Sequence, residues 1–210
     1  MVHVNPSAQP VKRYVITLRE TPERRESCRR HLEDVGFCNY NFWEGVNALK
    51  WGLMTRNTYD VDHPGSGFII PMKHVGLHLS HWILWNIAYE SDNEITSIME
   101  DDVALAGDWQ ARLESVLKAA PEDWDIIMLG SCNTTGKPSA HVNGSLFEVK
   151  YPQCTHWYLV RRKALPILIA TQEKSWAPID LALIFNSFPQ LRVYTAIPRL
   201  ASQHNMDLAE

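Results

Sequence analysis

Three adjacent carboxylates that follow an apolar run constrain this chain more than any other feature. Residues 94–99 favour a buried strand, and Glu100, Asp101 and Asp102 come directly after it. Most acidic runs are solvated surface, but open α/β sheets bind ligands beyond the carboxyl ends of their strands. Because hard divalent cations prefer oxygen ligands, the run predicts a site for a metal ion and a diphosphate.

Strand and helix patterns alternate along the rest of the chain. A β-branched run at residues 14–18 leads to Thr21 as a predicted helix N-cap and Pro22 at the first helical position, and Gly36 ends that helix. Asp108 is the predicted cap of a later helix. Further helices are predicted at residues 73–89, 109–117, 163–171 and 179–186, strands at 125–129, 146–149, 156–160 and 191–197, and loops at 51–71 and 131–145. This order predicts one α/β domain over residues 1–210.

Composition excludes several classes of function. The chain has 210 residues, 45% of them hydrophobic and 21% charged, which is globular composition. A net charge of -4 without a basic block argues against nucleic-acid binding. No apolar run reaches the roughly 20 residues of a membrane span, and residues 1–10 lack the pattern of a signal peptide. The expected compartment is the cytosol, with peripheral membrane association as an alternative.

Cysteine spacing gives no metal or redox motif. The chain contains Cys28, Cys38, Cys132 and Cys154, with no Cys-x-x-Cys pair. The sequence therefore predicts buried free thiols.

Histidines supply two candidate metal ligand sets. His74, His78 and His81 share one face of the predicted helix at 73–89, a spacing that could hold zinc, although no acid accompanies them and a structural or supporting role is the stronger interpretation. His204 near the C-terminus could complete a carboxylate metal site, or it could be an exposed terminal residue.

Asp180 opens an apolar helix and has two interpretations. A carboxylate there stabilises the helix dipole. Alternatively it is a general base, because transferring a sugar to a hydroxyl with inversion requires a carboxylate near the acceptor oxygen. The competing acids Asp60, Asp62 and Asp125 lie in an irregular loop or at the other end of a strand.

Motifs of other nucleotide and hydrolytic enzymes are absent. The sequence has no Gly-x-x-x-x-Gly-Lys loop, no Gly-x-Gly-x-x-Gly and no Gly-x-Ser-x-Gly. Two functions stay open as alternatives to sugar transfer: a metal-dependent nucleotidyl or phosphoryl transferase, and a pseudoenzyme that binds a sugar.

Taken in order, these pieces resemble glycosyltransferase family 25, which includes lipopolysaccharide-type transferases and collagen galactosyltransferases. The resemblance rests on an ordered series of segments: residues 14–18 with Arg24 and Arg25, residues 42–48, 76–85, 100–102, 124–129 and 155–165, residues 178–180, and Pro198 with Gln203. Departures occur at His74, at the loop 51–71, and at His156 and Trp157, which replace the small residues usual before the family's tyrosine.

The resemblance implies a GT-A-type domain with a mixed, mostly parallel sheet flanked by helices. It also implies transfer of a hexose, galactose by preference, from a UDP-sugar to a glycan, lipid-linked or protein hydroxyl, with inversion and with Mn²⁺ or Mg²⁺. Thr17, Leu18 and Arg25 would lie near the nucleotide, together with Glu100 and Asp101. Glu100 and Asp102 would hold the metal and Asp180 would face the acceptor, while His204 as a third metal ligand is inferred from chemistry alone.

Overall fold

The computed structural model describes residues 11–51, 72–132, 140–143, 146–149, 151–173 and 177–203. Its strands are β1 (Lys12–Thr17), β2 (Asn41–Glu44), β3 (Ile95–Glu100), β4 (Val103–Leu105), β5 (Ile126–Gly130), β6 (Ala140–Asn143), β7 (Leu146–Glu148), β8 (Trp157–Arg161), β9 (Val193–Ala196) and β10 (Ala201–Gln203). Its helices are α1 (Pro22–Asp34), α2 (Met72–Glu90), α3 (Trp109–Ala119), α4 (Leu165–Thr171) and α5 (Ile179–Ala182).

One eight-stranded sheet organises these elements, in the order β2-β1-β3-β8-β5-β9-β7-β6. The strands β1, β2 and β3 run parallel, as do β5 and β9, while β8 lies antiparallel between β3 and β5. Since β7 is antiparallel to both β9 and β6, only β7 and β8 oppose the common direction. The expected mixed, mostly parallel sheet is confirmed.

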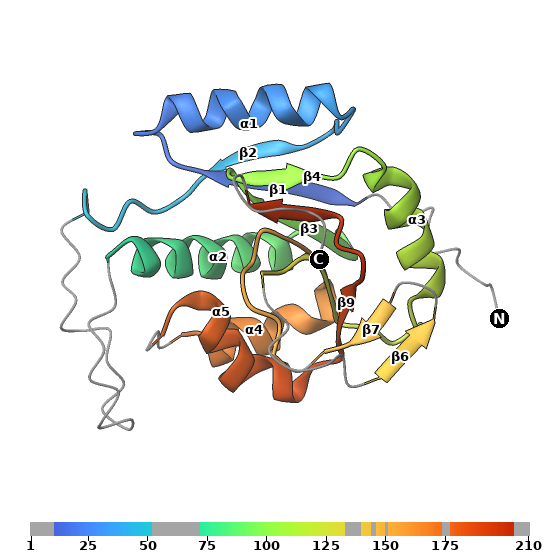
Figure 1. The fold of residues 1–210 in the computed structure, drawn as a ribbon. Helices are drawn as coiled ribbons and strands as arrows, with labels where there is room; N and C mark the ends of the chain where they lie inside the picture. The colour runs from blue at the N-terminus through green and yellow to red at the C-terminus, as the bar shows by residue number, and fades with distance from the viewer. Residues whose placement is uncertain are drawn as a thin grey trace.

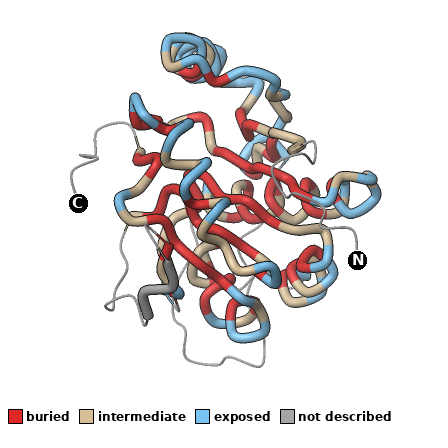
Figure 2. The backbone as a smooth tube through the Cα atoms, turned by 90° about the vertical axis from the view of Figure 1, so that its right-hand side faces the viewer, coloured by how far each residue is buried: buried red, intermediate tan, exposed pale blue. Residues whose placement is uncertain are grey.

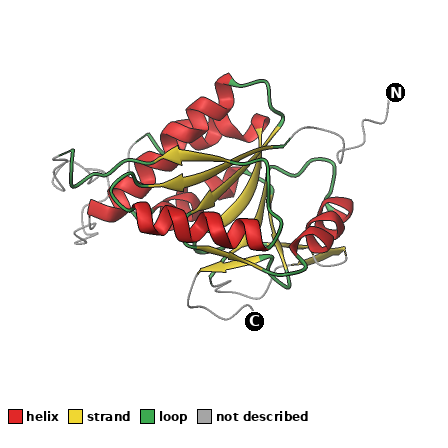
Figure 3. Ribbon diagram, turned by 90° about the horizontal axis from the view of Figure 1, so that it is seen from above, coloured by secondary structure: helices red, strands yellow, loops and turns green. Residues whose placement is uncertain are grey.

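Helices cover both faces of this sheet (Figures 1 and 3). Successive residues of the central strands alternate between two apolar clusters: Val15 and Met99 pack on the side of α1 and α3, whereas Ile16 and Ile98 pack on the side of α2, α4 and α5. This period of two is what a strand buried on both faces requires. The buried strands run through the centre, and exposed residues gather on the outer surfaces of helices and in loops (Figure 2).

Several predicted boundaries need correction. The loop predicted at 131–145 contains β6, and the short antiparallel pair of β4 and β10 was not predicted. The helix predicted at 179–186 becomes α5 followed by a π-helical turn, Leu183–Ser187. The side chains of Thr21 and Asp108 form no capping bond, although α1 and α3 begin directly after them. The predicted loop 51–71 lies almost entirely outside the described residues.

No helix in the described ranges combines the length and apolarity that crossing a bilayer requires.

The helix α2 lies close to the segment that follows β2. The side chain of Ser80 accepts a hydrogen bond from the Val46 amide at 2.8 Å and donates one to the Gly76 carbonyl at 2.7 Å. At Gly76, an added Cβ would lie 2.5 Å from the carbonyl oxygen of Val46. This approach holds α2 against the loop beyond β2, on the same edge as the acid run.

On its other side, α2 contacts the end of α4 through a histidine. His78 is buried, and its Nε2 lies 3.1 Å from the carbonyl oxygen of Gln172, so this nitrogen carries the hydrogen. Burial lowers the pKa of His78 to about 4, against a smaller raising effect of the Gln172 carbonyl. His78 is therefore uncharged at neutral pH and packs between α2 and the end of α4.

Gly76→Ala should destabilise the protein although alanine favours helices by about 1 kcal/mol. The new methyl group would collide with backbone, and overpacking costs about 1–3 kcal/mol, so we expect a net loss of up to about 2 kcal/mol in denaturant unfolding. Gly107→Ala is the matched control, because nothing lies within 4 Å of its Cβ position. Equal stability of the two variants would contradict the close contact.

His78→Gln should change how stability depends on pH. A base with a lowered folded pKa contributes stability above its unfolded value of 6.5 and loses it as the pH falls toward 4. The loss should reach about 3 kcal/mol for that pKa difference. Glutamine can keep the bond to the Gln172 carbonyl without titrating.

Unfolding curves between pH 4 and 7 should therefore be flatter for His78→Gln than for the unmodified chain. His74→Gln, at the less buried position one turn earlier, serves as the comparison. Identical pH profiles for His78→Gln and the unmodified chain would show that His78 does not supply this dependence.

Candidate functional site

The acid run lies at the carboxyl edge of the sheet, as predicted. Glu100 is the last residue of β3, and Asp101 and Asp102 form the turn into β4. Because β8 runs antiparallel, its first residues lie beside the ends of β3 and β5: Trp157 pairs with both Met99 and Gly130. One edge therefore collects the ends of parallel strands and the start of the reversed strand.

Asp101 is the buried member of the acid run, and both of its oxygens have protein partners. Thr17 Oγ1 donates to Oδ2 at 3.0 Å, and Arg24 Nη2 donates to Oδ1 at 2.5 Å. Burial raises the pKa of Asp101, and the positive charge of Arg24 opposes that effect. Asp101 thus joins β1 and α1 to the turn, which makes it a positioning group for its two neighbours.

The two consecutive arginines of α1 have different environments. Arg24 is half exposed, and its Nη2 also lies 3.4 Å from Asp102 Oδ2. The guanidinium of Arg25 lies 4.7 Å from the ring centroid of Phe42. Nucleotide contacts of Arg25 and of the half-buried Leu18 stay predictions, whereas Arg24 is the arginine placed against the acids.

Glu100 is held by Thr155, which precedes β8, and by His81 of α2. Thr155 Oγ1 donates to Glu100 Oε1 at 2.5 Å, and His81 Nε2 lies 3.7 Å from the same oxygen. Burial alone would raise the pKa of Glu100, but its interactions with His81 and Thr155 outweigh burial and lower it. Glu100 is therefore kept as a carboxylate in a largely enclosed position.

The buried side chain of His81 links this carboxylate to the core. Its Nδ1 lies 2.9 Å from Tyr158 Oη, which also accepts a bond from Trp85 Nε1 at 2.9 Å. An indole nitrogen only donates, so the tyrosine hydrogen is available to His81 Nδ1. The hydrogen of neutral His81 then lies on Nε2, facing Glu100. This arrangement agrees with the supporting role favoured for the histidine row.

Asp102 and His156 each present a buried polar atom without a hydrogen-bond partner among the described residues. Gln203 Nε2 donates to Asp102 Oδ2 at 2.8 Å, but Asp102 Oδ1 and His156 Nδ1 are unpaired. Ligand atoms of Glu100, Asp102 and His156 lie within 4.8 Å of one another. Two carboxylates and one imidazole with unused lone pairs fit a divalent cation.

His156 was not predicted as a site residue, although the sequence showed that it replaces a small residue. The available signal was its position at the start of a strand that pairs with β3: the Glu100 amide donates to the His156 carbonyl at 3.1 Å. His204, the predicted imidazole ligand, lies outside the described residues.

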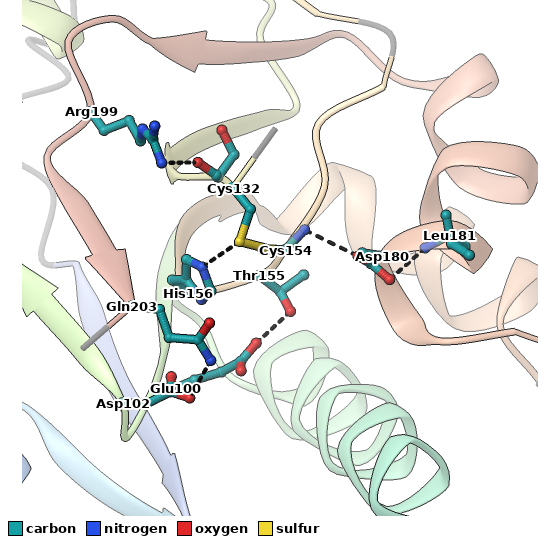
Figure 4. The surroundings of a disulfide bond; sticks show 11 residues. Glu100, Asp102, Cys132, Cys154, Thr155, His156, Asp180, Leu181, Arg199 and Gln203 are labelled. Carbon is teal, nitrogen blue, oxygen red and sulfur yellow. Dashed lines mark hydrogen bonds between the residues drawn. A yellow bond between two sulfur atoms is a disulfide. The ribbon is translucent and has the colours of Figure 1, made fainter. Parts of the chain in front are cut away.

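A disulfide corrects the prediction of free thiols. Cys132 and Cys154 are bonded to each other, with Cα atoms 5.5 Å apart, while Cys28 is a buried free thiol and Cys38 an exposed one. The pairing follows from the antiparallel contact of β5 and β8, since Cys132 follows one strand and Cys154 precedes the other. Cys132 Sγ lies 2.9 Å from His156 Nε2 (Figure 4).

Asp180 is separated from Glu100 and Asp102 by Cys154 and Thr155 (Figure 4). Its Oδ2 accepts a bond from the Cys154 amide at 3.2 Å, and its Oδ1 accepts one from the Leu181 amide at 2.9 Å. These contacts fix the half-buried carboxylate at the start of α5. They suit helix stabilisation and also the fixed orientation that a general base requires.

A solved structure supports the expected GT-A-type architecture. A glycosyltransferase involved in the glycosylation of the major capsid of PBCV-1 superposes with a TM-score of 0.54 at 14% identity. The superposition covers 95% of this chain and 96% of that one. At this identity the likeness shows a common fold.

Curated relatives include one that is named as inactive and one that is named for a galactosyltransferase activity. The chain is 25% identical to the probable inactive glycosyltransferase 25 family member 3 of Bos taurus, covering 90% of this chain and 36% of the relative. It is also 25% identical to procollagen galactosyltransferase 1-B of Xenopus laevis, covering 84% of this chain and 31% of that protein. The chain thus spans about a third of the length of these relatives.

The profile of glycosyltransferase family 25 (LPS biosynthesis protein) matches residues 11–157, which is more than half of the chain. That range contains β1, α1 and the acid run, and it ends at the start of β8. The chain belongs to glycosyltransferase family 25.

Proposed function

We propose that this chain transfers a hexose from a UDP-sugar to a hydroxyl acceptor, with inversion and with the help of a divalent cation. The observation that carries this proposal is the group of Glu100, Asp102 and His156 at the carboxyl edge of the sheet. Two buried polar atoms of this group have no hydrogen-bond partner within the described part of the chain. Galactose is the proposed sugar because a relative is named as a galactosyltransferase. The acceptor class is a glycan, lipid-linked or protein hydroxyl.

Glu100, Asp102 and His156 would hold Mn²⁺ or Mg²⁺. When bound, such an ion neutralises the charge that develops on a leaving diphosphate. Thr155 and His81 keep Glu100 ionised and oriented, and Gln203 orients Asp102. Arg24, 3.4 Å from Asp102, places a further positive charge beside the phosphate position.

Asp180 is proposed to take the proton of the acceptor hydroxyl. Inversion places the attacking oxygen opposite the leaving diphosphate, so the base belongs on a different side of the sugar from the metal. Burial lowers the pKa of His74, and the charge of Lys73 lowers it further. The negative charges of Asp180 and Glu100 oppose this shift without reversing it. Both carboxylates therefore act electrostatically on the first turn of α2.

A panel of nucleotide sugars tests this function. Binding and slow hydrolysis should require a divalent cation and select one UDP-sugar, with UDP as the released product. Release of pyrophosphate or phosphate would instead indicate a nucleotidyl or phosphoryl transferase. Failure to bind any nucleotide sugar in the presence of Mn²⁺ would indicate a non-catalytic family member.

Asp102→Asn should abolish most metal-dependent donor binding. Loss of an outer partner of a metal ligand already costs up to about 100-fold in affinity, so losing a charged ligand should cost at least that much. Binding can be measured by calorimetry with the UDP-sugar and Mn²⁺, and Asp108→Asn, at an exposed ion pair with Arg112, is the control. Full activity in excess EDTA with no bound metal would refute the metal role.

Asp180→Asn should lower sugar transfer by about 100-fold or more while preserving donor affinity, which is the usual size of a general-base contribution. Asp125→Asn is the matched control, because Asp125 also accepts a backbone hydrogen bond, from the Arg192 amide at 2.9 Å, before the first residue of β5. Turnover within a few-fold of the unmodified chain would place the base elsewhere. Collapse of donor binding would assign Asp180 to the sugar or metal site.

A further inference from the structure

The imidazole of His156 lies between two different sets of potential metal ligands. On one side are Glu100 and Asp102, and on the other are the sulfurs of Cys132 and Cys154 (Figure 4). Ligand atoms of Cys132, Cys154 and His156 also lie within 4.8 Å of one another. The carboxylates are hard ligands and the sulfurs are soft ones, so the two sets favour different ions.

The disulfide determines which nitrogen of His156 is available. A disulfide sulfur can only accept a hydrogen bond, so the 2.9 Å contact with Cys132 Sγ places the hydrogen of neutral His156 on Nε2. The lone pair then lies on Nδ1, the buried nitrogen without a partner among the described residues. In the oxidised chain His156 can therefore offer Nδ1 to a cation, with its other nitrogen held by sulfur.

We propose that reduction of this disulfide creates a second metal site, in which the thiolates of Cys132 and Cys154 and Nε2 of His156 bind Zn²⁺ or a similar soft cation. Two thiolates and one imidazole leave the fourth tetrahedral position for water. Sulfurs bound to one tetrahedral zinc lie about 3.8 Å apart, given Zn–S bonds of about 2.3 Å. Side chains whose Cα atoms are 5.5 Å apart can reach that separation.

The redox step requires a dithiol reductant. Two electrons and two protons pass from the dithiol to the Cys132–Cys154 bond, which breaks to give two thiols, while the dithiol becomes a disulfide. Zinc then displaces both thiol protons to solvent as the Zn–S bonds form. The zinc ion itself is neither oxidised nor reduced.

The soft site and the carboxylate site exclude each other through one imidazole. Neutral histidine has a single lone pair, so zinc on Nε2 requires the hydrogen on Nδ1 and removes the third ligand from Glu100 and Asp102. Zinc binding by the reduced chain should therefore weaken Mn²⁺ binding at the carboxylates. This competition rests on the proposed metal site, whereas zinc capture by the thiols does not.

Cobalt titration of the full chain tests the soft site. After reduction and removal of the reductant under argon, one equivalent of Co²⁺ should produce the intense sulfur-to-cobalt charge-transfer absorption, and zinc should abolish it by displacement. The oxidised chain should show no such band. This comparison of two redox states requires no substitution.

Single substitutions test which side chains bind the cobalt ion. Cys132→Ser and Cys154→Ser should each lose most of the charge-transfer band. His156→Gln should bind Co²⁺ more weakly than the unmodified reduced chain. Cys38→Ser is the control and should bind Co²⁺ like the unmodified reduced chain, because Cys38 is an exposed free thiol outside the proposed site. Circular dichroism checks that each variant is folded. No band in the reduced chain, or an undiminished band in both Cys132→Ser and Cys154→Ser, would overturn the proposal.

A second measurement separates this inference from the proposed function. Electron paramagnetic resonance of Mn²⁺ should show binding to the oxidised chain and weaker binding after stoichiometric zinc is added to the reduced chain. Cobalt capture without any Mn²⁺ binding would support the soft site and contradict the proposed metal role of Glu100 and Asp102. Mn²⁺ binding that zinc leaves unchanged would contradict the shared imidazole.

Discussion

The antiparallel insertion of β8 between β3 and β5 is the constraint on which the site depends. In a wholly parallel sheet, the segment before a strand lies at the opposite edge from the carboxylates that end its neighbours. Reversing β8 brings Thr155 and His156 beside Glu100, and Cys154 beside Cys132. The candidate metal ligand group, the hydrogen bond from Thr155 to Glu100 and the disulfide all follow from the direction of this one strand.

The three members of the acid run occupy a largely enclosed position, and each has a different set of partners. Asp101 is neutralised by Arg24 and hydrogen-bonded to Thr17, while Glu100 accepts from Thr155 and faces the Nε2 hydrogen of His81. Burying a carboxylate without such partners would cost several kcal/mol. One oxygen of Asp102 has no hydrogen-bond partner among the described residues, which is unfavourable for a purely structural group and suits a metal ligand.

The sequence correctly predicted the structural features that depend on residues close together in the chain. The alternation of strands and helices and the position of Glu100, Asp101 and Asp102 at the end of β3 are confirmed. The features that were missed, the disulfide and the placement of His156, require knowing which strands pair and in which direction. The same limit applies to the arginines: adjacent residues on a helix point about 100° apart, so sequence alone could not tell that Arg24 reaches the acids.

The disulfide suggests a chemical reason for the histidine at position 156, where the family usually has a small residue. A small residue at this position could not connect the carboxylates with the cysteines, whereas an imidazole has one nitrogen for each side. Disulfides persist in oxidising compartments, and the cytosol predicted from the sequence would keep the same cysteines reduced. In the proposed arrangement, the redox state of Cys132 and Cys154 decides which nitrogen of His156 binds a cation: Nδ1 beside the carboxylates when the disulfide is formed, or Nε2 beside the thiolates when it is reduced.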